Sequence, residues 1–288
     1  MRIGFIGAGV VGTALARALN QAGYTVVAAA SRRFESAQRL AESVPGCAPY
    51  PELQAAADAS DLVFVTTRDD AVEAVARSVR WRRGQMVVYT SGATTVSTLA
   101  AAKEAGAQTA GFHPLQTFAN AEQALANLPG TTFVLEGEGE VMALLEKMAE
   151  DLGGRHLTLR SEDKVLYHAA AVVTSNYTVT LMQMAADLWR AFGVETDVAV
   201  QALLPLLKGT VRNIEAVGLP RCLTGPVARG DIGTIRAHLQ AMEERAPELL
   251  PAYRELALRA IPIGIAKGTL DPAAAEALRE TLKAHDAD

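Results

Sequence analysis

The chain begins with a short apolar strand pattern that runs directly into three closely spaced glycines. Arg2 to Ile6 has the composition of a buried strand, and a helical pattern starts soon after it. In a dinucleotide site, the first glycine of G-x-G-x-x-G allows the tight turn, the second leaves room for a pyrophosphate, and the third lets helix and strand pack closely. Unpaired N–H groups at the helix start then face the phosphates. A glycine motif alone occurs in many turns, but the order strand, glycines, helix predicts dinucleotide binding by Gly7, Ala8, Gly9, Val10, Val11 and Gly12.

The end of the second expected strand indicates which dinucleotide binds. The run Tyr24–Ala30 is followed by Ser31, Arg32 and Arg33, about twenty residues beyond the glycines. An NAD site usually has Asp or Glu here to bind the ribose 2′-OH. A carboxylate would repel a 2′-phosphate, whereas a hydroxyl and two guanidiniums would bind it. The sequence therefore predicts NADP(H) as the cofactor; the alternative is that the two arginines only make a loop soluble.

Length and composition restrict the class of protein. At 288 residues the chain exceeds a typical single domain, so we expect two domains. A net charge of −5 argues against a nucleic-acid-binding surface. We expect neither a membrane span nor a signal peptide, because apolar runs are short and a strand pattern starts the chain. Cys47 and Cys222 lie far apart without metal-ligand spacing, so we expect a cytoplasmic protein with no metal site.

Strand and helix patterns alternate through the first part of the chain. Strands are expected at 2–6, 24–29, 61–66, 85–90, 108–112, 131–135 and 155–159, with a short one near Cys47, and the helices between them include 13–22, 34–44, 69–79, 94–105 and 138–152. This alternation predicts an α/β fold with a doubly wound, mostly parallel Rossmann sheet.

After Ser161 the strand pattern stops. Helices are expected at 162–192, 197–216, 231–245, 247–266 and 271–285. We therefore expect an NADP-binding Rossmann domain over residues 1–160. An all-α domain for substrate binding and dimerisation should follow over residues 161–288.

Polar residues follow three of the expected strands, at the edge where open α/β sheets bind their ligands. Thr66 and Thr67 end one strand and would lie near the ribose and nicotinamide of the cofactor. Ser91 ends the next strand with a hydroxyl. His113 ends the strand after that, where an imidazole can polarise a substrate oxygen or take its proton near neutral pH. The alternative is that His113 only orders the loop before Pro114.

Polar residues also share one face of the long helix expected over 162–192. Lys164, His168 and Ser175 are spaced i, i+4 and i+11, with Asn176 adjacent, and small apolar residues lie between them. Polar groups on a face otherwise suited to burial need partners, and a substrate pocket would supply them. The alternative is an exposed lysine in the first turn and a hydrogen-bonded histidine of the core.

A turn-rich segment of the second half contains Arg229, immediately before an expected helix that Asp231 could cap. Its guanidinium could bind a substrate carboxylate, in its own subunit or in a partner. It could equally pair with Asp231, and the sequence does not separate these alternatives.

Three segments of the chain resemble the signature blocks of a bacterial Rossmann-like oxidoreductase family. They are His113-Pro-Leu-Gln-Thr-Phe118, Tyr167-His-Ala-Ala-Ala-Val with Ser175-Asn-Tyr177, and Leu223-Thr-Gly-Pro-Val-Ala-Arg-Gly-Asp231. The C-terminal part of this family is domain of unknown function 2520. The resemblance implies a place near the β-hydroxyacid dehydrogenase, ketopantoate reductase and pyrroline-carboxylate reductase group. It also implies an N-terminal NADP-binding domain and a helical, often dimer-forming C-terminal domain, but it gives no substrate.

The resemblance implies roles for individual residues. β-Hydroxyacid dehydrogenases start their long helix with a catalytic Lys, followed four residues later by Asn. Lys164 fits the Lys position, whereas His168 stands where Asn would be, which leaves the substrate class open. Prephenate dehydrogenases carry a catalytic Ser after one strand and His-Pro after the next, and Ser91 and His113-Pro114 are similar.

These features together predict an NADP-dependent reductase or dehydrogenase. It would transfer a hydride between nicotinamide and a small carboxylate-bearing carbonyl, hydroxyl or imine substrate, and would form a homodimer through its C-terminal helices. Lys164 and His113 would move the proton; His168, Ser91 and Asn176 would orient the reacting group, and Arg229 would bind the carboxylate. Two alternatives are an NADP(H)-binding sensor or scaffold without turnover, and an enzyme that transfers hydride from reduced deazaflavin to NADP.

Overall fold

The computed structural model describes residues 1–283 and divides into two compact units, the first over residues 1–175 and the second from Asn176 onward. We expected the boundary after residue 160. The first unit also includes the helix α8 (Lys164–Thr174), which follows the last strand.

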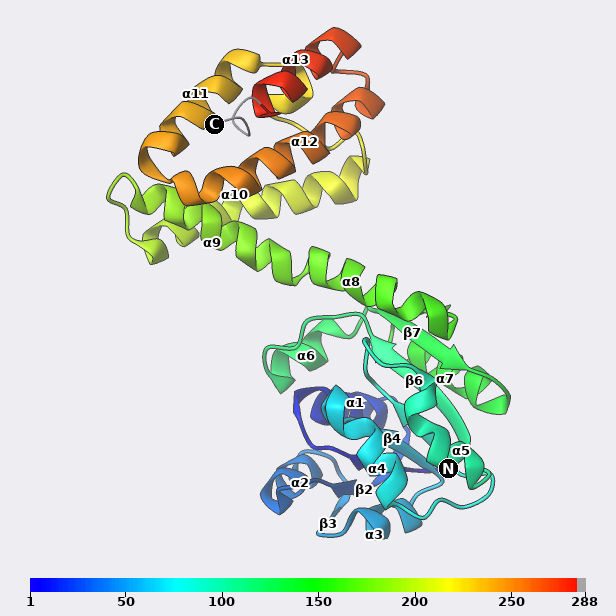
Figure 1. Ribbon diagram of the computed structural model, residues 1–288. Coiled ribbons are helices and arrows are strands. Elements are labelled where there is room, and N and C mark those ends of the chain that lie inside the picture. Colours follow the sequence, from blue (N-terminus) through cyan, green and yellow to red (C-terminus); the bar gives the residue numbers. More distant parts are fainter. Residues whose placement is uncertain (284–288) are drawn as a thin grey trace. The chain divides into compact units, whose positions relative to one another are not determined.

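A sheet of eight strands forms the centre of the first unit (Figure 1). In spatial order the strands are β3 (Ala48–Tyr50), β2 (Thr25–Ala30), β1 (Arg2–Ile6), β4 (Leu62–Val65), β5 (Met86–Tyr89), β6 (Gln108–Pro114), β7 (Thr132–Gly137) and β8 (Arg155–Thr158). The strands from β3 to β6 are parallel, β7 is antiparallel to β6, and β8 is parallel to β7. The predicted doubly wound, mostly parallel sheet is confirmed, and its order reverses between β1 and β4, where such sheets bind ligands.

Helices cover both faces of this sheet, because successive residues of a strand point to opposite faces. One face is packed by α1 (Val10–Gln21), α2 (Phe34–Glu42), α6 (Ala121–Asn127) and α7 (Glu140–Asp151). The other is packed by α3 (Leu53–Asp58), α4 (Val72–Ser78) and α5 (Ala100–Glu104). On the first face, the rings of Phe5, Phe64, Phe112 and Phe133 contact one another in sequence across the sheet.

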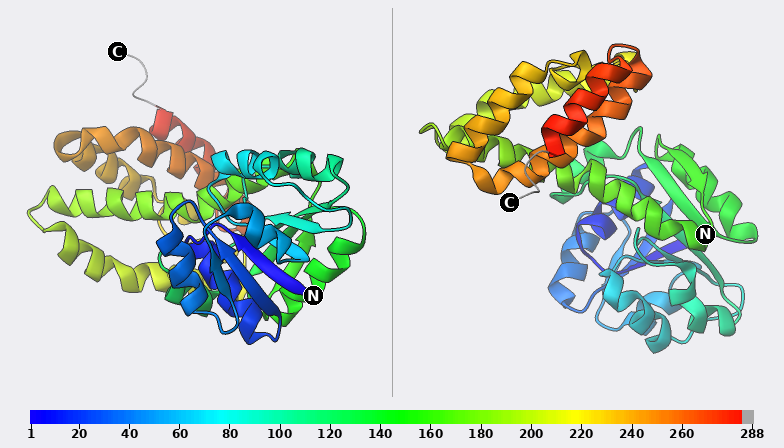
Figure 2. Two further views of the ribbon diagram at one scale, coloured as in Figure 1. Left: turned by 90° about the horizontal axis from the view of Figure 1, so that it is seen from below. Right: turned by 45° about the horizontal axis from the view of Figure 1, so that its top comes forward.

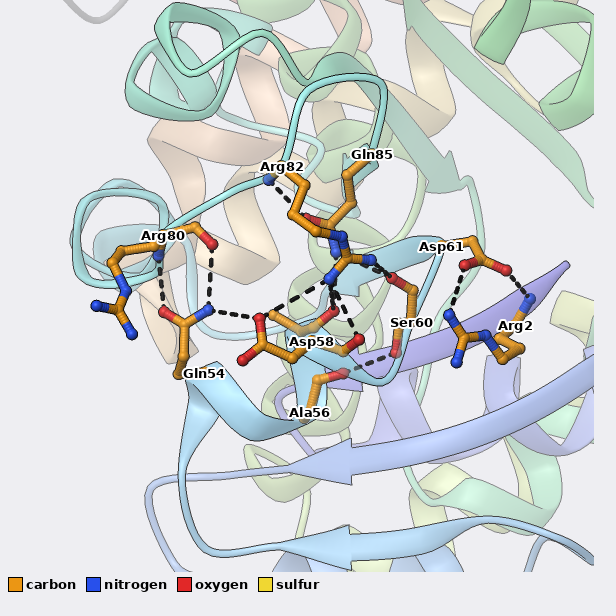
Figure 3. A network of polar contacts seen from close by, with 10 residues as sticks. Arg2, Gln54, Ala56, Asp58, Ser60, Asp61, Arg80, Arg82 and Gln85 are labelled. Atoms are coloured by element: carbon orange, nitrogen blue, oxygen red, sulfur yellow. Dashed lines mark hydrogen bonds and ion pairs between the residues drawn. The ribbon is translucent and has the colours of Figure 1, made fainter.

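A polar network closes the edge of the sheet at which β4 and β5 begin (Figure 3). The guanidinium of Arg82 donates to the carbonyl oxygens of Asp58 and Ser60, at 3.2 and 2.6 Å. The buried Gln85 donates to the carbonyl oxygens of Ala57 and Ser60, at 2.8 and 3.0 Å. Carbonyls at a helix C-terminus lack helical partners. The network therefore satisfies the end of α3 and fixes it beside the sheet.

The second unit is built from helices over its described residues (Figures 1 and 2). They are α9 (Asn176–Arg190), α10 (Thr196–Val217), α11 (Ile232–Arg245), α12 (Leu250–Lys267) and α13 (Pro272–Lys283). The helices from α11 to α13 enclose a core that includes Ile235, Leu239, Ile261 and Leu278. The all-α character predicted for this part is confirmed. Residues 284 and 285 of the last predicted helix lie outside the described residues, and no helix within 1–283 is both long and apolar enough to cross a membrane.

The helix expected over 162–192 is interrupted in the structure. α8 and α9 are separated by Ser175, whose φ and ψ are −97° and −66°. Here the sequence reads Thr174-Ser175-Asn176, and such side chains compete with helical backbone hydrogen bonds. The Thr174 hydroxyl donates to the Ala170 carbonyl oxygen at 3.0 Å. The predicted polar face is therefore broken before Asn176.

Candidate cofactor and substrate site

The three glycines after β1 have three different surroundings. Gly7 has a φ of +112°, and a Cβ there would lie 2.6 to 2.8 Å from backbone atoms of Thr66 and Thr67. A Cβ on Gly12 would lie 2.4 Å from the carbonyl oxygen of Gly7. A Cβ on Gly9 would meet nothing within 4 Å. Gly7 and Gly12 are thus required by packing. Gly9 faces open space, as a turn that binds a pyrophosphate requires.

The first turn of α1 can offer backbone N–H groups to an anion. Gly9 is the N-cap residue, no side chain caps the helix, and its first turn holds no acidic residue. The Thr13 N–H donates to the Gly9 carbonyl oxygen at 2.9 Å. The N–H groups of Val10, Val11 and Gly12 precede that bond and have no helical acceptor. A phosphate at this position would accept hydrogen bonds from them.

The end of β4 lies against this turn and carries the two predicted threonines. The hydroxyl of Thr66 donates to the Gly7 carbonyl oxygen at 2.5 Å and so holds the turn. The hydroxyl oxygen of Thr67 is buried and has no hydrogen-bond partner among the described residues. Leaving a buried hydroxyl unpaired costs about 1–3 kcal/mol, so the Thr67 hydroxyl suits a hydrogen bond to a ligand.

The end of β2 lies beside the first glycine. The Gly7 N–H donates to the Ala30 carbonyl oxygen at 2.8 Å, which brings the segment Ser31-Arg32-Arg33 close to the turn. Arg32 and Arg33 are exposed, and in the part of the chain that the structure describes neither guanidinium forms an ion pair. Two unpaired cations next to the glycine turn suit a 2′-phosphate.

Lys164, the first residue of α8, is fully buried. Its Nζ donates to the Tyr89 hydroxyl at 2.8 Å and to the Ser91 carbonyl oxygen at 3.0 Å, and it lies 3.5 Å from Oε2 of Glu136. Burial lowers the pKa of this amine, and the Glu136 carboxylate opposes that effect. This is the geometry of a buried structural ion pair. Proton transfer by Lys164, which the family resemblance implies, stays a prediction.

Glu136 is the partner that sequence reasoning missed. It lies on β7 with 2% of its surface exposed, and Oε1 accepts hydrogen bonds from the Val96 N–H at 3.0 Å and the Ser161 hydroxyl at 2.5 Å. Oε2 accepts a hydrogen bond from the Tyr89 hydroxyl, and burial with this neighbour raises the pKa of Tyr89. One carboxylate thus joins three segments. Its only signal in the sequence was a carboxylate immediately after the strand expected at 131–135.

His113 and Tyr167 form a hydrogen-bonded pair at the end of β6. Nδ1 of His113 lies 2.6 Å from the Tyr167 hydroxyl oxygen, and the two rings meet edge to face with centroids 5.7 Å apart. Burial lowers the pKa of His113 to about 4, and the neighbouring Lys164 amine and His168 imidazole lower it further. Burial also raises the pKa of Tyr167. Both side chains are therefore neutral at pH 7. Sequence analysis selected His113 but gave Tyr167 no role.

Gly92 allows the two predicted histidines to approach each other. A Cβ on this glycine would lie 2.7 Å from Nε2 of His113 and 3.0 Å from Cδ2 of His168. Both rings thus flank the same residue of the loop after β5. The structure therefore brings together His113 and His168, which are far apart in the sequence.

Ser91 shapes the same loop. Its hydroxyl oxygen accepts hydrogen bonds from the N–H groups of Ala93 and Thr94, each at 3.1 Å. Its carbonyl oxygen accepts from Lys164, while the O–H of Ser91 keeps its capacity to donate, so substrate binding by Ser91 stays a prediction. The Thr94 hydroxyl oxygen is buried and has no hydrogen-bond partner among the described residues, which makes it a second candidate ligand contact.

Asn176 and Arg229 belong to the second unit. Asn176 is exposed at the start of α9. Arg229 lies in a short 3-10 helix with 63% of its side chain exposed, and its guanidinium is 4.0 Å from Asp231. Asp231 caps α11, as predicted, by accepting hydrogen bonds from the Thr234 N–H and hydroxyl at 3.0 and 2.8 Å. Substrate binding by Asn176 and Arg229 stays a prediction.

Two family models match the chain. Residues 1–114 match a Rossmann-like domain, and residues 131–260 match DUF2520, a domain of unknown function. The N-terminal match agrees with the predicted Rossmann domain, and the C-terminal match is to the domain that the three sequence blocks suggest.

Several solved structures have a similar fold over nearly their whole length. A Bacteroides fragilis protein provisionally assigned as an NADP oxidoreductase is 27% identical; the match covers 91% of this chain and 98% of that chain, with a TM-score of 0.70. Protein TM1727 from Thermotoga maritima is 24% identical, covers 98% of both chains and has a TM-score of 0.62. A reductive aminase from Aspergillus terreus, in complex with NADPH and ethyl-5-oxohexanoate, is 20% identical, with 95% and 97% covered and a TM-score of 0.66. The likeness to protein TM1727 and to the reductive aminase shows the fold alone. A search of curated proteins found no match.

Proposed function

We propose that this protein is an NADP(H)-dependent reductase or dehydrogenase. The observation that carries the proposal is the turn after β1, which is open at Gly9 and lies beside the exposed Arg32 and Arg33. The assignment of the Bacteroides fragilis protein as an NADP oxidoreductase supports this cofactor. The NADPH bound to the Aspergillus terreus reductive aminase supports it as well.

Different residues around the turn would bind different parts of the cofactor. The N–H groups at the start of α1 would bind the pyrophosphate, Arg32 and Arg33 the 2′-phosphate, and the Thr67 hydroxyl a polar group beyond the pyrophosphate. When bound, the nicotinamide supplies or accepts the hydride. The protein then has to orient the substrate and to move one proton.

We propose as substrate a small molecule with a carbonyl, hydroxyl or imine group and a carboxylate. His113 and His168 lie together at the edge of the sheet where ligands bind, and they are the imidazoles available to orient the reacting group. Asn176 and Arg229 are our candidates for a second polar contact and for the carboxylate. Turnover tests this part: NADPH absorbance should fall with at least one member of a panel of 2-keto acids and cyclic imines, or rise from NADP+ with a 3-hydroxy acid.

Calorimetric titration with NADPH and NADH tests the cofactor without turnover. We expect NADPH to bind more tightly. The combined change Arg32→Ala and Arg33→Ala should weaken NADPH binding by about tenfold or more, because charged hydrogen bonds are worth about 1.5–3 kcal/mol, and should leave NADH binding unchanged. Arg39→Ala is the matched control, since Arg39 is an exposed arginine of α2, the helix that follows Arg33, and donates to Ser36.

Each outcome assigns the protein to one class. Equal affinity for NADPH and NADH in the unchanged protein would contradict the NADP(H) assignment. Tight NADPH binding without turnover of any panel member would favour a sensor or scaffold. If reduced deazaflavin reduces NADP+ and no panel member reacts, the protein would be an enzyme that transfers hydride from deazaflavin to NADP.

We also propose that the protein is a homodimer joined through its second unit. The helices α9 and α10 expose large apolar side chains, among them Val179, Val198 and Leu206 at 71, 57 and 68%. Apolar surface of this extent on neighbouring helices is typical of a protein–protein interface. A second copy of the chain is the partner that the sequence predicts for these helices.

A further inference from the structure

We propose that Tyr167 is the residue that exchanges a proton with the substrate, and that His113 stabilises the phenolate formed. The proposal rests on the proposed oxidoreductase function. It also narrows the substrate class, because it names the oxygen of a carbonyl or hydroxyl group as the atom that exchanges the proton.

The amine of Lys164 is held by other groups of the protein. Its amine contacts Tyr89, the Ser91 carbonyl oxygen and the buried Glu136, and none of its surface is exposed. If the amine gave up its proton, the buried carboxylate would lose its counter-charge, which is strongly unfavourable. Lys164 is therefore a positioning residue for the start of α8.

Tyr167 lies close to the buried ion pair of Lys164 and Glu136 along α8. It follows Lys164 by three residues in the first turns of α8, so the buried ion pair fixes the part of the helix that carries it. Its hydroxyl oxygen lies 2.6 Å from Nδ1 of His113, near the carboxyl end of β6. That end of the sheet is the edge at which the glycine turn lies, and it is where open α/β sheets hold their substrates.

The Tyr167 phenol and the His113 imidazole together allow proton transfer to a substrate oxygen. With the imidazole protonated at Nδ1, its N–H donates to the phenol oxygen and leaves the phenol O–H free to donate to a substrate oxygen. As the carbonyl carbon of the substrate takes up hydride from NADPH, the electron pair of the C=O bond moves to oxygen. The Tyr167 O–H bond breaks, and its proton forms the O–H bond of the product alcohol. The phenolate then regains a proton from Nδ1 while Nε2 takes one from water, and the hydroxide formed passes to the solvent. The neutral imidazole returns to its Nδ1–H form by exchanging its ring proton with water.

The acidity of the pair favours an oxygen over an imine nitrogen. Burial raises the pKa of Tyr167 above its ordinary value, and burial lowers that of His113. A phenol of raised pKa is a poor acid for an imine, which has to be protonated before it accepts hydride. The same phenol is strong enough to protonate an alkoxide as it forms. These shifts agree with proton exchange at a substrate oxygen, which the geometry of the phenol–imidazole pair allows.

Tyr167→Phe tests the proposal, and Tyr253→Phe is its matched control. The Tyr253 hydroxyl lies 2.8 Å from Nδ1 of His238 with the rings edge to face, but this pair lies on α11 and α12 of the second unit. With the best keto acid of the panel, Tyr167→Phe should lower kcat by about 10²-fold or more, as loss of a proton-transfer group does. KM, the Kd of NADPH and the melting temperature should stay unchanged. Tyr253→Phe should leave all four quantities unchanged.

Nitrogen NMR of histidine-labelled protein without cofactor gives a readout independent of turnover. Tyr167→Phe should shift the Nδ1 signal of His113 and leave that of His238 in place, whereas Tyr253→Phe should do the reverse.

The two proposals fail in different ways. If the unchanged protein does not bind NADPH, the proposed function is wrong. If it binds and oxidises NADPH but Tyr167→Phe keeps full kcat, only the role of Tyr167 is overturned. Loss of NADPH binding or of the folded state together with kcat would make Tyr167 structural and would also overturn the proposal. A cyclic imine turned over faster than every keto acid would overturn the substrate class.

Discussion

A buried lysine keeps its charge most readily beside a counter-charge, and Lys164 has one in Glu136. The two side chains are 1% and 3% exposed, and their charged atoms lie 3.5 Å apart. The Tyr89 hydroxyl and the Ser91 carbonyl oxygen satisfy the rest of the amine. Removing one member of such a pair leaves a buried charge without compensation, whereas replacing both can be nearly neutral.

Lys164→Met should therefore lower the free energy of unfolding by about 3–5 kcal/mol. The double variant Lys164→Met with Glu136→Gln should recover much of this loss, because no buried charge remains. Urea denaturation of the two single variants and the double variant provides the measurement. Equal destabilisation by Lys164→Met and the double variant would mean that the ion pair contributes nothing and that the lysine acts through packing.

The depressed pKa of His113 predicts a specific dependence of stability on pH. Its pKa is about 4 in the folded protein against 6.5 for a free imidazole, and Lys164, His168 and Tyr167 face it. The unfolded chain therefore takes up a proton first as the pH falls. The resulting stability is complete above pH 6.5 and is lost between about 6.5 and 4, by at most about 3 kcal/mol. His113→Asn should flatten this part of the curve of unfolding free energy against pH; an unchanged slope would contradict the assignment.

At the scale of elements, the turn between β1 and α1 offers a matched pair of glycine substitutions. Gly9 has a φ of −83° and open space around a Cβ, so Gly9→Ala should fold normally but should weaken NADPH binding about tenfold or more. Gly12→Ala would place a methyl group 2.4 Å from the Gly7 carbonyl oxygen, so it should lower the melting temperature as well. Thermal melting and NADPH titration of both variants separate the two effects. A Gly9→Ala variant with unchanged affinity would show that the cofactor phosphates bind elsewhere.

The strands of the first unit could be predicted closely from the sequence, because buried parallel strands are apolar runs bounded by turn residues. The predicted strand 108–112, for example, extends two residues further, to Pro114. The interruption of the long helix at Ser175 was missed because apolar periodicity does not register hydroxyl side chains that compete for the backbone. The helix α11 and its cap by Asp231 were predicted because both signals are local.

The site itself was predictable only in part. The glycine turn and the two arginines follow from spacing along the chain. The pairs Lys164–Glu136 and His113–Tyr167 join residues 28 and 54 positions apart, and nothing in a single sequence shows which distant residues meet. Lys164 was therefore predicted as a proton donor, and Tyr167 was given no role.

At the scale of the whole molecule, the exposed apolar side chains of α9 and α10 decide the expected oligomeric state. Leu206→Glu places a charge where 68% of an apolar side chain is exposed. If a second copy covers this surface, the variant should sediment as a monomer while the unchanged protein sediments as a dimer, because burying an unpaired charge is costly. Leu256→Glu is the control, since Leu256 is an exposed leucine on α12. A monomeric unchanged protein would contradict the dimer.

The close approach at Gly92 has a consequence for how this protein can evolve. A Cβ at position 92 would lie 2.7 Å from Nε2 and 2.8 Å from Cε1 of His113, so that ring would have to shift to admit any other amino acid. Among descendants of a common ancestor, a larger residue at 92 should then be found together with a smaller one at 113. Those lineages would also have given up the histidine–tyrosine pair, and with it the chemistry assigned to it here.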